Sequence, residues 1–201
     1  MFELLRRTAT HPSDAKLAQA VGNGDGEAMA ELYRRHGALI YRFTLRMSQN
    51  AAIAEEITHE VFLALLRQSE RFDPQRAALS TWLCSIARRQ LWKHFERNER
   101  FVSIESFDEP FDMPSAEPDP AEWLTRKEAI AAVREGVDHL SLPLKEVIIL
   151  CELEEMTYEQ AAQILAIPLG TVRSRLSRAK ARLALLLAGV PACAEKEKST
   201  L

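Results

Sequence analysis

A cluster of arginines and serines near the C-terminal end is the part of the chain best suited to bind another molecule. The residues are Arg173, Ser174, Ser177 and Arg178. Their helical spacing places them on one side of an expected helix. Guanidinium and small hydroxyl groups at a helix start suit hydrogen bonding to base edges in the DNA major groove. The sequence therefore predicts a DNA-reading helix.

Residues 156–183 have the pattern of two helices joined by a tight turn. Thr157 and Gln160 have the form of a capping box, in which a hydroxyl and an amide satisfy the free donors of a helix start. Residues 168–170, reading PLG, are expected to break the chain before a second helix from Thr171. The buried stripe of that helix is expected to be Val172, Leu176, Ala179 and Leu183. The segment is predicted to be a helix-turn-helix.

A second helix, opened by Ser80, is expected to expose an aromatic and basic face. That face carries Trp82, Arg88, Arg89, Trp92 and Lys93. The loop and helix start before it contain Phe72, Gln75 and Thr81. Bases pulled from the DNA stack gain roughly 1–3 kcal/mol each by stacking on aromatic rings, while cations hold the backbone. The face is suited to hold opened DNA, although Trp82 has the alternative role of packing beneath the loop.

The distribution of charge supports a nucleic-acid partner although the total does not. The formal net charge is -3, with 47% hydrophobic and 27% charged residues, as in an ordinary globular protein. The charge is segregated, because residues 101–122 contain no Lys or Arg and residues 171–190 contain no Asp or Glu. Such asymmetry indicates nucleic-acid contact.

The three cysteines, Cys84, Cys151 and Cys193, are too far apart in sequence for a zinc or disulfide motif. A reducing, cytoplasmic setting is expected. The N-terminal residues lack the apolar run of a signal peptide, and no window approaches the roughly 20 apolar residues of a membrane span. No membrane insertion, metal site, cofactor or catalytic residue set is predicted.

Apolar residues recur every three or four positions over 29–47 and over 53–65, which predicts two amphipathic helices. Asp25 and Asn50 are placed to cap them. Pro74 forces the chain out of the helical conformation after the second. The N-terminal half is therefore expected to be helical.

Four prolines and the acidic run predict an extended linker over 101–121. A helix is expected over 123–140, with Gly136 a weak point. The expected order is an N-terminal extension (1–24), a helical domain (25–100), the linker (101–121), a second helical domain (122–190) and a tail (191–201). The predicted fold class is all-α, with two small helical domains joined by a flexible acidic linker.

Both halves of the chain resemble the bacterial extracytoplasmic-function (ECF) sigma factors, the smallest members of the sigma-70 group. The resemblance rests on AMAELYRRHGALIYRFTLRM and AEEITHEVFLALLRQSERFDPQRAALSTWLCSIARRQ in the first half. In the second half it rests on SLPLKEVIILCELEEMTYEQAAQILAIPLGTVRSRLSRAKARL. Two matching halves in this order, joined by an acidic linker, make the resemblance specific.

The resemblance implies an alternative sigma factor that catalyses nothing itself. The first domain would be sigma domain 2, which binds the clamp helices of the RNA polymerase β′ subunit and reads and melts the minus-ten element. The second would be sigma domain 4, which reads the minus-thirty-five element and contacts the β flap. Such proteins act as monomers within the holoenzyme and are usually held inactive by an anti-sigma factor.

The resemblance also assigns residues to these roles. Minus-thirty-five recognition falls to Thr171, Arg173, Ser174, Arg175, Ser177, Arg178 and Arg182. Minus-ten recognition and melting fall to Phe72, Gln75, Thr81, Trp82, Arg88, Arg89, Trp92 and Lys93. Polymerase binding falls to Glu55, Glu56, Glu60, Phe62 and Leu66. From the residues alone, the row of carboxylates is equally consistent with a solubility face.

The chain departs from the family at three positions. Arg89 and Lys93 stand where members usually have Asn and Asp, which makes this face more basic and leaves its minus-ten preference open. Glu155 stands where members often have Gly in a left-handed turn. Keeping that backbone would cost on the order of 1 kcal/mol, so a slight rearrangement of the turn is expected.

Two other classes of protein remain open. A helix-turn-helix regulator of the response-regulator type would read a palindrome as a dimer, but would not need the WLCSIARRQ helix. A decoy that binds polymerase or an anti-sigma factor would be expected to lack arginines on its DNA-reading helix. An enzyme is the least supported class.

Overall fold

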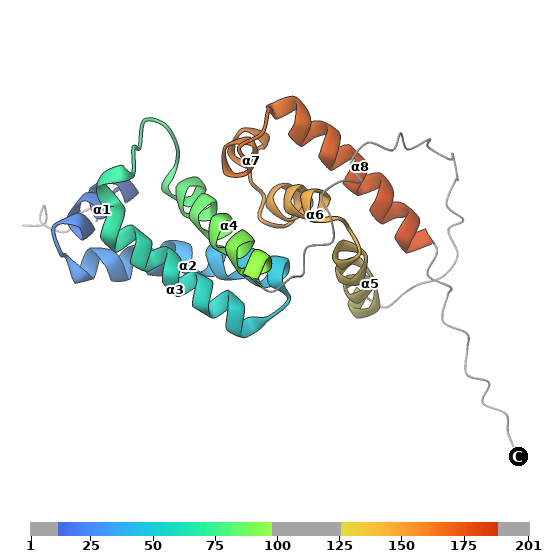
Figure 1. The fold of residues 1–201 in the computed structure, drawn as a ribbon, viewed down its shortest axis with the longest axis horizontal. Helices are drawn as coiled ribbons and strands as arrows, with labels where there is room; N and C mark the ends of the chain where they lie inside the picture. The colour runs from blue at the N-terminus through green and yellow to red at the C-terminus, as the bar shows by residue number, and fades with distance from the viewer. Residues whose placement is uncertain (1–11, 98–125, 189–201) are drawn as a thin grey trace, which may run out of the picture. The chain divides into compact units, whose positions relative to one another are not determined.

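The chain divides into two compact units, Met1–Glu99 and Arg100–Leu201. The computed structural model describes residues 12–97 and 126–188 (Figure 1). The first unit contains α1 (Asp14–Gly22), α2 (Gly26–Ser48), α3 (Ala51–Gln68), the 3-10 turn η1 (Ser69–Arg71) and α4 (Leu79–Arg97). The second contains α5 (Arg126–Asp138), α6 (Leu142–Ile148), the π-helical turn η2 (Ile149–Leu153), α7 (Tyr158–Leu165) and α8 (Leu169–Ala188). Every regular element in these ranges is helical, which confirms the predicted all-α class with two helical units.

Side chains predicted to cap the helices do so. Asp25 accepts two backbone N–H groups of α2 at 2.9 and 3.1 Å, and Asn50 accepts two of α3 at 2.9 and 3.2 Å. The Thr157 N–H donates to Gln160 Oε1 at 2.9 Å, and the Gln160 N–H donates to Thr157 Oγ1 at 3.2 Å. Each such cap stabilises a helix by about 1 kcal/mol.

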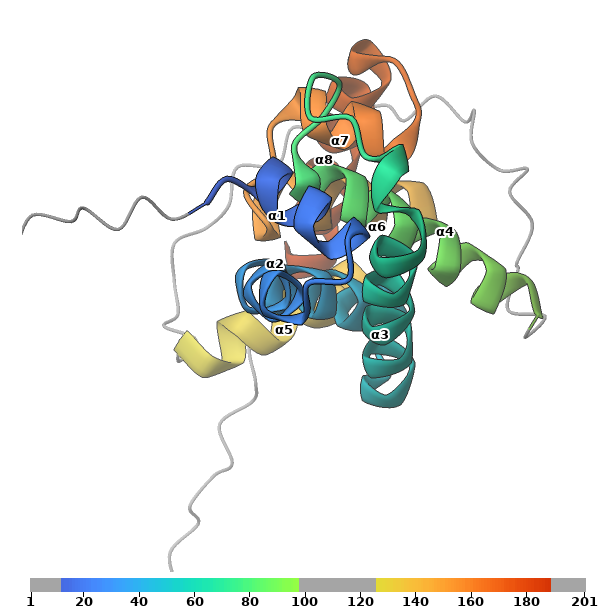
Figure 2. The same ribbon diagram turned by 90° about the vertical axis from the view of Figure 1, so that its left-hand side faces the viewer.

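The first unit is held together by mutual packing of α2, α3 and α4, with α1 against α2 and α3 (Figures 1 and 2). Its most deeply buried large side chains are Leu32, Ile40, Phe43, Val61, Leu65, Leu83 and Leu91. Those of α2 and α3 fall within the apolar periodicities predicted over 29–47 and 53–65. Their burial fixes which side of each helix faces outward.

The N-terminal extension predicted over residues 1–24 contains a helix that the apolar periodicity did not reveal. This helix, α1, buries Leu17, Ala18 and Val21 against α2, α3 and η1. Its three core residues are too few for the pattern to stand out from a loop. Residues 14–22 therefore belong to the first unit.

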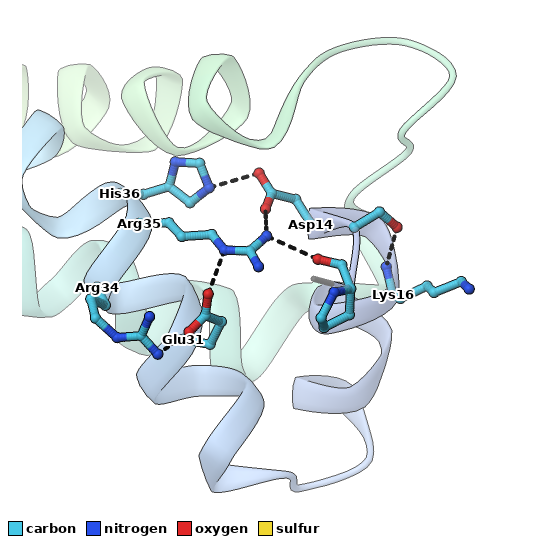
Figure 3. Close-up of polar contacts among 8 residues, drawn as sticks. Asp14, Lys16, Glu31, Arg34, Arg35 and His36 are labelled. Atoms are coloured by element: carbon cyan, nitrogen blue, oxygen red, sulfur yellow. Dashed lines mark hydrogen bonds and ion pairs between the residues drawn. The ribbon is translucent and has the colours of Figure 1, made fainter. Parts of the chain in front are cut away.

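A polar network anchors the start of α1 to α2 (Figure 3). Asp14 accepts a hydrogen bond from Arg35 Nη1 at 2.8 Å, and its second oxygen lies 2.7 Å from His36 Nε2. Arg35 also donates to the Pro12 carbonyl at 2.9 Å and to Glu31 at 2.6 Å. The hydrogen bond from Arg35 lowers the pKa of Glu31. Ion pairing therefore joins α1 and α2 where the described chain begins.

In the second unit α7 and α8 form the predicted helix-turn-helix. Its buried side chains are Ala161, Ile164, Leu165, Val172, Leu176 and Ala179. The recognition helix begins at Leu169, two residues earlier than predicted. The reason is that the Pro168 carbonyl accepts the N–H groups of Thr171 and Val172 at 2.9 and 3.2 Å, so Pro168 already acts as the helix cap.

Gly136, predicted as a weak point, lies in a close contact between α5 and α8. A Cβ atom at this position would lie 2.5 Å from Leu183 Cδ1. The missing side chain therefore lets the two helices approach closely.

Several predicted segments lie outside the described residues: part of the extension, the linker over 101–121, the start of the helix expected from 123, and the tail over 191–201. None of the described helices has the length and apolar character needed to cross a membrane.

The turn before the helix-turn-helix keeps the left-handed backbone that suits glycine. Glu155 has a φ of 54°, so the rearrangement expected from the sequence does not occur. On either side, the Glu154 N–H donates to the Ile149 carbonyl at 2.9 Å and the Met156 N–H donates to the Leu150 carbonyl at 3.0 Å, both in η2. These bonds hold the turn in place despite its strain.

We expect Glu155→Gly to stabilise the full chain by about 1 kcal/mol, because glycine adopts this conformation without the Cβ clash. Glu154→Gly is the matched control, since Glu154 has an ordinary φ of -108° and gains nothing from glycine. Urea denaturation of both variants measures the difference. A less stable Glu155→Gly protein would mean that the carboxylate contributes more than the strain costs.

Candidate nucleic-acid interface

The side chains predicted to read DNA lie together on α8. Arg173, Ser174, Ser177, Arg178 and Arg182 are exposed, while Thr171 and Arg175 are half-buried. The Ser174 hydroxyl donates to the Thr171 carbonyl at 3.1 Å, and Arg178 Nε donates to the Ser174 carbonyl at 3.4 Å. From residue 173 to 182 the row spans about 14 Å at 1.5 Å per residue. The exposed row is long enough to contact several successive base pairs.

An acidic side chain near the start of this row was not recognised in the sequence. Glu159 lies in the first turn of α7, where its own backbone N–H is the largest cause that lowers its pKa. The Thr157 hydroxyl and the positive charge of Arg173 lower it further. A glutamate in a first helical turn is ordinary helix-start chemistry, so the sequence gives no sign that it faces Arg173. Its charge makes this end of the row less attractive to phosphate than the arginines alone suggest.

Lys180 differs from the arginines of α8 because its side chain forms an ion pair with another element of the same unit. Its Nζ lies 2.9 Å from a carboxylate oxygen of Glu152 in η2. That hydrogen bond is the main cause that raises the pKa of Lys180. Lys180 therefore joins α8 to η2.

Burial disfavours the thiolate form of the two described cysteines, Cys84 and Cys151. Burial raises the pKa of the Cys84 thiol to about 12. Burial, with a smaller effect of Glu152, raises the pKa of Cys151 to about 11. Both therefore remain thiols at neutral pH rather than reactive thiolates. Within 12–97 and 126–188, no group of three His, Cys, Asp or Glu side chains could hold a metal ion.

At the start of α4, two of the predicted aromatic residues pack on each other. The Phe72 and Trp82 rings lie 5.8 Å apart between centroids, tilted by 50°, and both are half-buried. The intervening loop is closed by Asp73, whose carboxylate accepts the Gln75 N–H at 2.9 Å. Trp82 therefore packs against the loop, which agrees with the alternative role considered for it. Gln75 is exposed at the loop surface.

Farther along α4 the predicted basic and aromatic side chains lie on its outward side. The Arg88 guanidinium lies 5.4 Å from the centre of the Trp92 ring, and both residues are half-buried. Arg89 and Lys93, four residues apart, are exposed. The guanidinium stabilises the ring by a cation–π contact while part of Trp92 stays accessible. This face combines a partly open aromatic ring with exposed cations.

Thr81 does not lie on this face, and its predicted place among the DNA-contacting residues needs correction. Its side chain is 1% exposed, and the hydroxyl has no hydrogen-bond partner among the described residues. The reason is rotational: Thr81 precedes Trp82 by one residue, or about 100° around the helix, which turns it into the core. It supports the helix start rather than touching DNA directly.

The predicted acidic row lies on the outside of α3. Glu55, Glu56 and Glu60 are exposed, and Leu66 is 49% exposed. A cavity of about 220 Å³ opens beside this row between α2 and α3. It is lined by Tyr33, Gly37, Ala38, Tyr41, Glu55, Thr58 and His59. A hollow with tyrosines and a carboxylate suits a basic or apolar side chain of a protein partner.

The solvent exposure of two aromatic residues beside this cavity is the reverse of what the sequence predicts. Phe62, expected on the outer face of α3, is only 5% exposed. Tyr33, within the apolar periodicity predicted over 29–47, is 44% exposed, and its ring lies 4.7 Å from that of Phe62. The tyrosine hydroxyl favours water, so Tyr33 covers the phenylalanine. Leu63, 38% exposed, is a further apolar residue of this surface that was not among the predicted polymerase-binding residues.

Comparison with protein families assigns both halves of the chain. The sigma-70 region 2 family matches residues 32–101, and the sigma-70 region 4 family matches residues 130–183. The ECF RNA polymerase sigma factor SigE of Mycolicibacterium smegmatis is 30% identical over 178 residues, covering 86% of this chain and 68% of SigE. RpoE of Cereibacter sphaeroides, also an ECF RNA polymerase sigma factor, is 26% identical, covering 79% of this chain and 86% of RpoE.

Solved structures share the fold. CnrH, determined in complex with the cytosolic domain of CnrY, superposes with a TM-score of 0.64 at 22% identity, covering 88% of this chain and 97% of CnrH. The sigma factor RpoE of Bartonella quintana, determined with the anti-sigma factor NepR, gives a TM-score of 0.60 at 24% identity, covering 80% and 97%. At this identity the likeness is one of fold.

Proposed function

This chain belongs to the ECF sigma factors of the sigma-70 family, and on that premise we propose that its two helical units divide promoter recognition between them. The observation that carries the proposal is the presence of a basic, outward face on one helix of each unit, α4 and α8. The family is not enzymatic, so the product of the chain's activity is a polymerase holoenzyme able to start at a chosen class of promoter.

In this proposal α8 reads the minus-thirty-five element. Arg173 and Arg178 are exposed and, with the small hydroxyls of Ser174 and Ser177, fit hydrogen bonding to base edges. Arg175 and Arg182 lie on the flanks and suit phosphates, which set register rather than sequence. Lys180, paired with Glu152, is excluded from the reading set.

The face of α4 holds opened DNA at the minus-ten element. Trp92 offers a partly accessible ring, and Arg88, Arg89 and Lys93 supply positive charge along the same side. Phe72 with Trp82 shapes the loop at the start of the helix. Since Arg89 and Lys93 are cations, this surface depends on phosphate contacts as well as on bases.

The acidic and apolar surface of α3 is the proposed contact with RNA polymerase. It consists of Glu55, Glu56, Glu60, Leu63 and Leu66 with Tyr33 of α2. A row of carboxylates repels DNA and suits a basic protein surface, where it increases the rate of association. We infer that an anti-sigma factor controls the chain by covering such a surface; the solved structure of RpoE of Bartonella quintana with the anti-sigma factor NepR supports this. The working compartment in this proposal is the cytoplasm.

Core RNA polymerase, free of other sigma factors, tests the proposal. We expect the full chain to support run-off transcription, and sequencing of the transcripts to identify a common upstream element. A protein that binds DNA but fails to stimulate core polymerase would instead be a helix-turn-helix regulator. A chain that binds polymerase without initiating would be a decoy.

Arg173→Ala and Arg178→Ala are expected to weaken holoenzyme binding to the cognate upstream element more than to random DNA. A bidentate arginine–guanine contact is worth roughly 1–3 kcal/mol of discrimination. Arg182→Ala is the matched control, because loss of a phosphate contact weakens both sequences alike. Competition binding on the two DNAs measures the ratio. Equal losses for Arg173→Ala and Arg182→Ala would remove the base-reading role.

Trp92→Ala is expected to slow promoter opening, since an opened base loses a stacking partner worth roughly 1–3 kcal/mol. Trp92→Phe keeps an aromatic ring and is expected to retain most of the opening rate. A fluorescent base analogue in the minus-ten element reports the melted state. Normal opening by Trp92→Ala would show that another side chain holds the strand.

A further inference from the structure

We propose that α1 is a positioning element for strand opening, acting through a contact between Gly22 at its C-terminal end and Ser69 in η1. The inference rests on the proposed function of α4 and the loop before it. Neither the apolar pattern of the sequence nor the region 2 match, which starts at residue 32, includes α1. The inference rests on four observations, which connect the start of α1 to the loop before α4.

The first observation is that α1 is anchored at its beginning. Asp14 holds both Arg35 and His36 of α2 at 2.8 and 2.7 Å, as Figure 3 shows. Asp14 and His36 are partly shielded, with side-chain exposures of 31% and 13%. Ion pairs with shielded partners are screened less by salt than fully exposed ones. The start of α1 is therefore fixed on the longest helix of the first unit.

The second observation is the close approach at the other end of α1. A Cβ atom built on Gly22 would lie 2.6 Å from Ser69 Oγ and 3.7 Å from Ser69 Cβ. Real Cβ contacts are not this short, so any side chain at Gly22 must push the Ser69 hydroxyl away. Ser69 is itself only 8% exposed, which leaves its hydroxyl little free space. Gly22 is therefore a place where α1 and η1 fit closely together.

The third observation connects η1 to the loop. The Ser69 carbonyl accepts the backbone N–H of Phe72 at 3.1 Å, and Phe72 ends the 3-10 turn. The fourth is that the Phe72 ring packs on Trp82 of α4 at 5.8 Å. Ser69 therefore links the Gly22 contact, made by its hydroxyl, to Phe72, held by its carbonyl, and through the Phe72 ring to α4.

This contact can be altered without disturbing the core of the unit. The core side chains of α1 are Leu17, Ala18 and Val21, which the contact with Ser69 does not involve. Gly22 has no positive φ, so alanine is compatible with its backbone. A substitution there tests the fit between α1 and η1 rather than the presence of α1.

The experiment measures promoter opening by holoenzyme containing Gly22→Ala. We expect opening to slow by about threefold or more, within the range of coupling between contacting residues. Ser69→Ala in the same chain removes the clashing oxygen and leaves the nearest atom at an ordinary 3.7 Å, so it is expected to restore the rate. Gly26→Ala is the matched control, because a Cβ at that glycine meets nothing within 4 Å.

Three further measurements decide the interpretation. Affinity for core polymerase and binding to the closed promoter duplex are expected to match the wild type, and so is the thermal unfolding midpoint of the double variant. Gly22→Ala with normal opening, or slow opening that Ser69→Ala does not restore, overturns the inference. An equal loss of polymerase affinity also overturns it, because the effect would then be general.

Trp92→Ala separates failure of this inference from failure of the proposed function. Slow opening by Trp92→Ala together with normal opening by Gly22→Ala overturns the role of α1 alone. Normal opening by both variants overturns the assignment of strand opening to α4, and the inference with it.

Discussion

The burial of one apolar stripe on each of α4 and α8 is the constraint on which the rest of the structure depends. Leu83, Ala87 and Leu91 of α4 are at most 1% exposed, and Val172 and Leu176 of α8 at most 3%. Removing such side chains from water stabilises a protein by about 1.5–3 kcal/mol for each large one. This energy fixes the rotation of both helices about their axes, so the charged side chains opposite need no partner to hold them outward.

The same constraint explains which site residues the sequence could predict. Side chains opposite a strong stripe, such as Arg178 and Lys93, are exposed as expected. Periodicity does not decide whether a side chain at the edge of a stripe is buried, because its burial depends on the neighbouring helix. Phe62 and Tyr33 illustrate this. Their rings are in contact, and because only tyrosine has a hydroxyl, Tyr33 is the one exposed to solvent. Thr81 is the other case: it is buried, although it lies one residue from the half-buried Trp82.

Helix ends limited the prediction of the fold for a different reason. Capping side chains leave a local signature, and Asp25, Asn50 and Thr157 were predicted from it. Left-handed ends leave none when the residue is not glycine, as at Gln49 and Ala166, where φ is 55°. Such a conformation costs roughly 1–2 kcal/mol per residue and persists only because the packed helices on both sides determine the path of the chain. A pattern of single residues cannot express that balance.

A net charge of -3 does not weaken a DNA-binding protein whose charges are sorted by helix face. At physiological ionic strength, exposed charges are screened beyond about 8 Å, so an acidic face and a basic face farther apart than this act independently. The carboxylates of α3 suit a basic protein surface, and the exposed cations of α4 and α8 suit phosphate. Glu159 is within range of Arg173, and there the two signs do interact. The acid at that end of α8 therefore reduces the attraction to any phosphate there, whatever the DNA sequence.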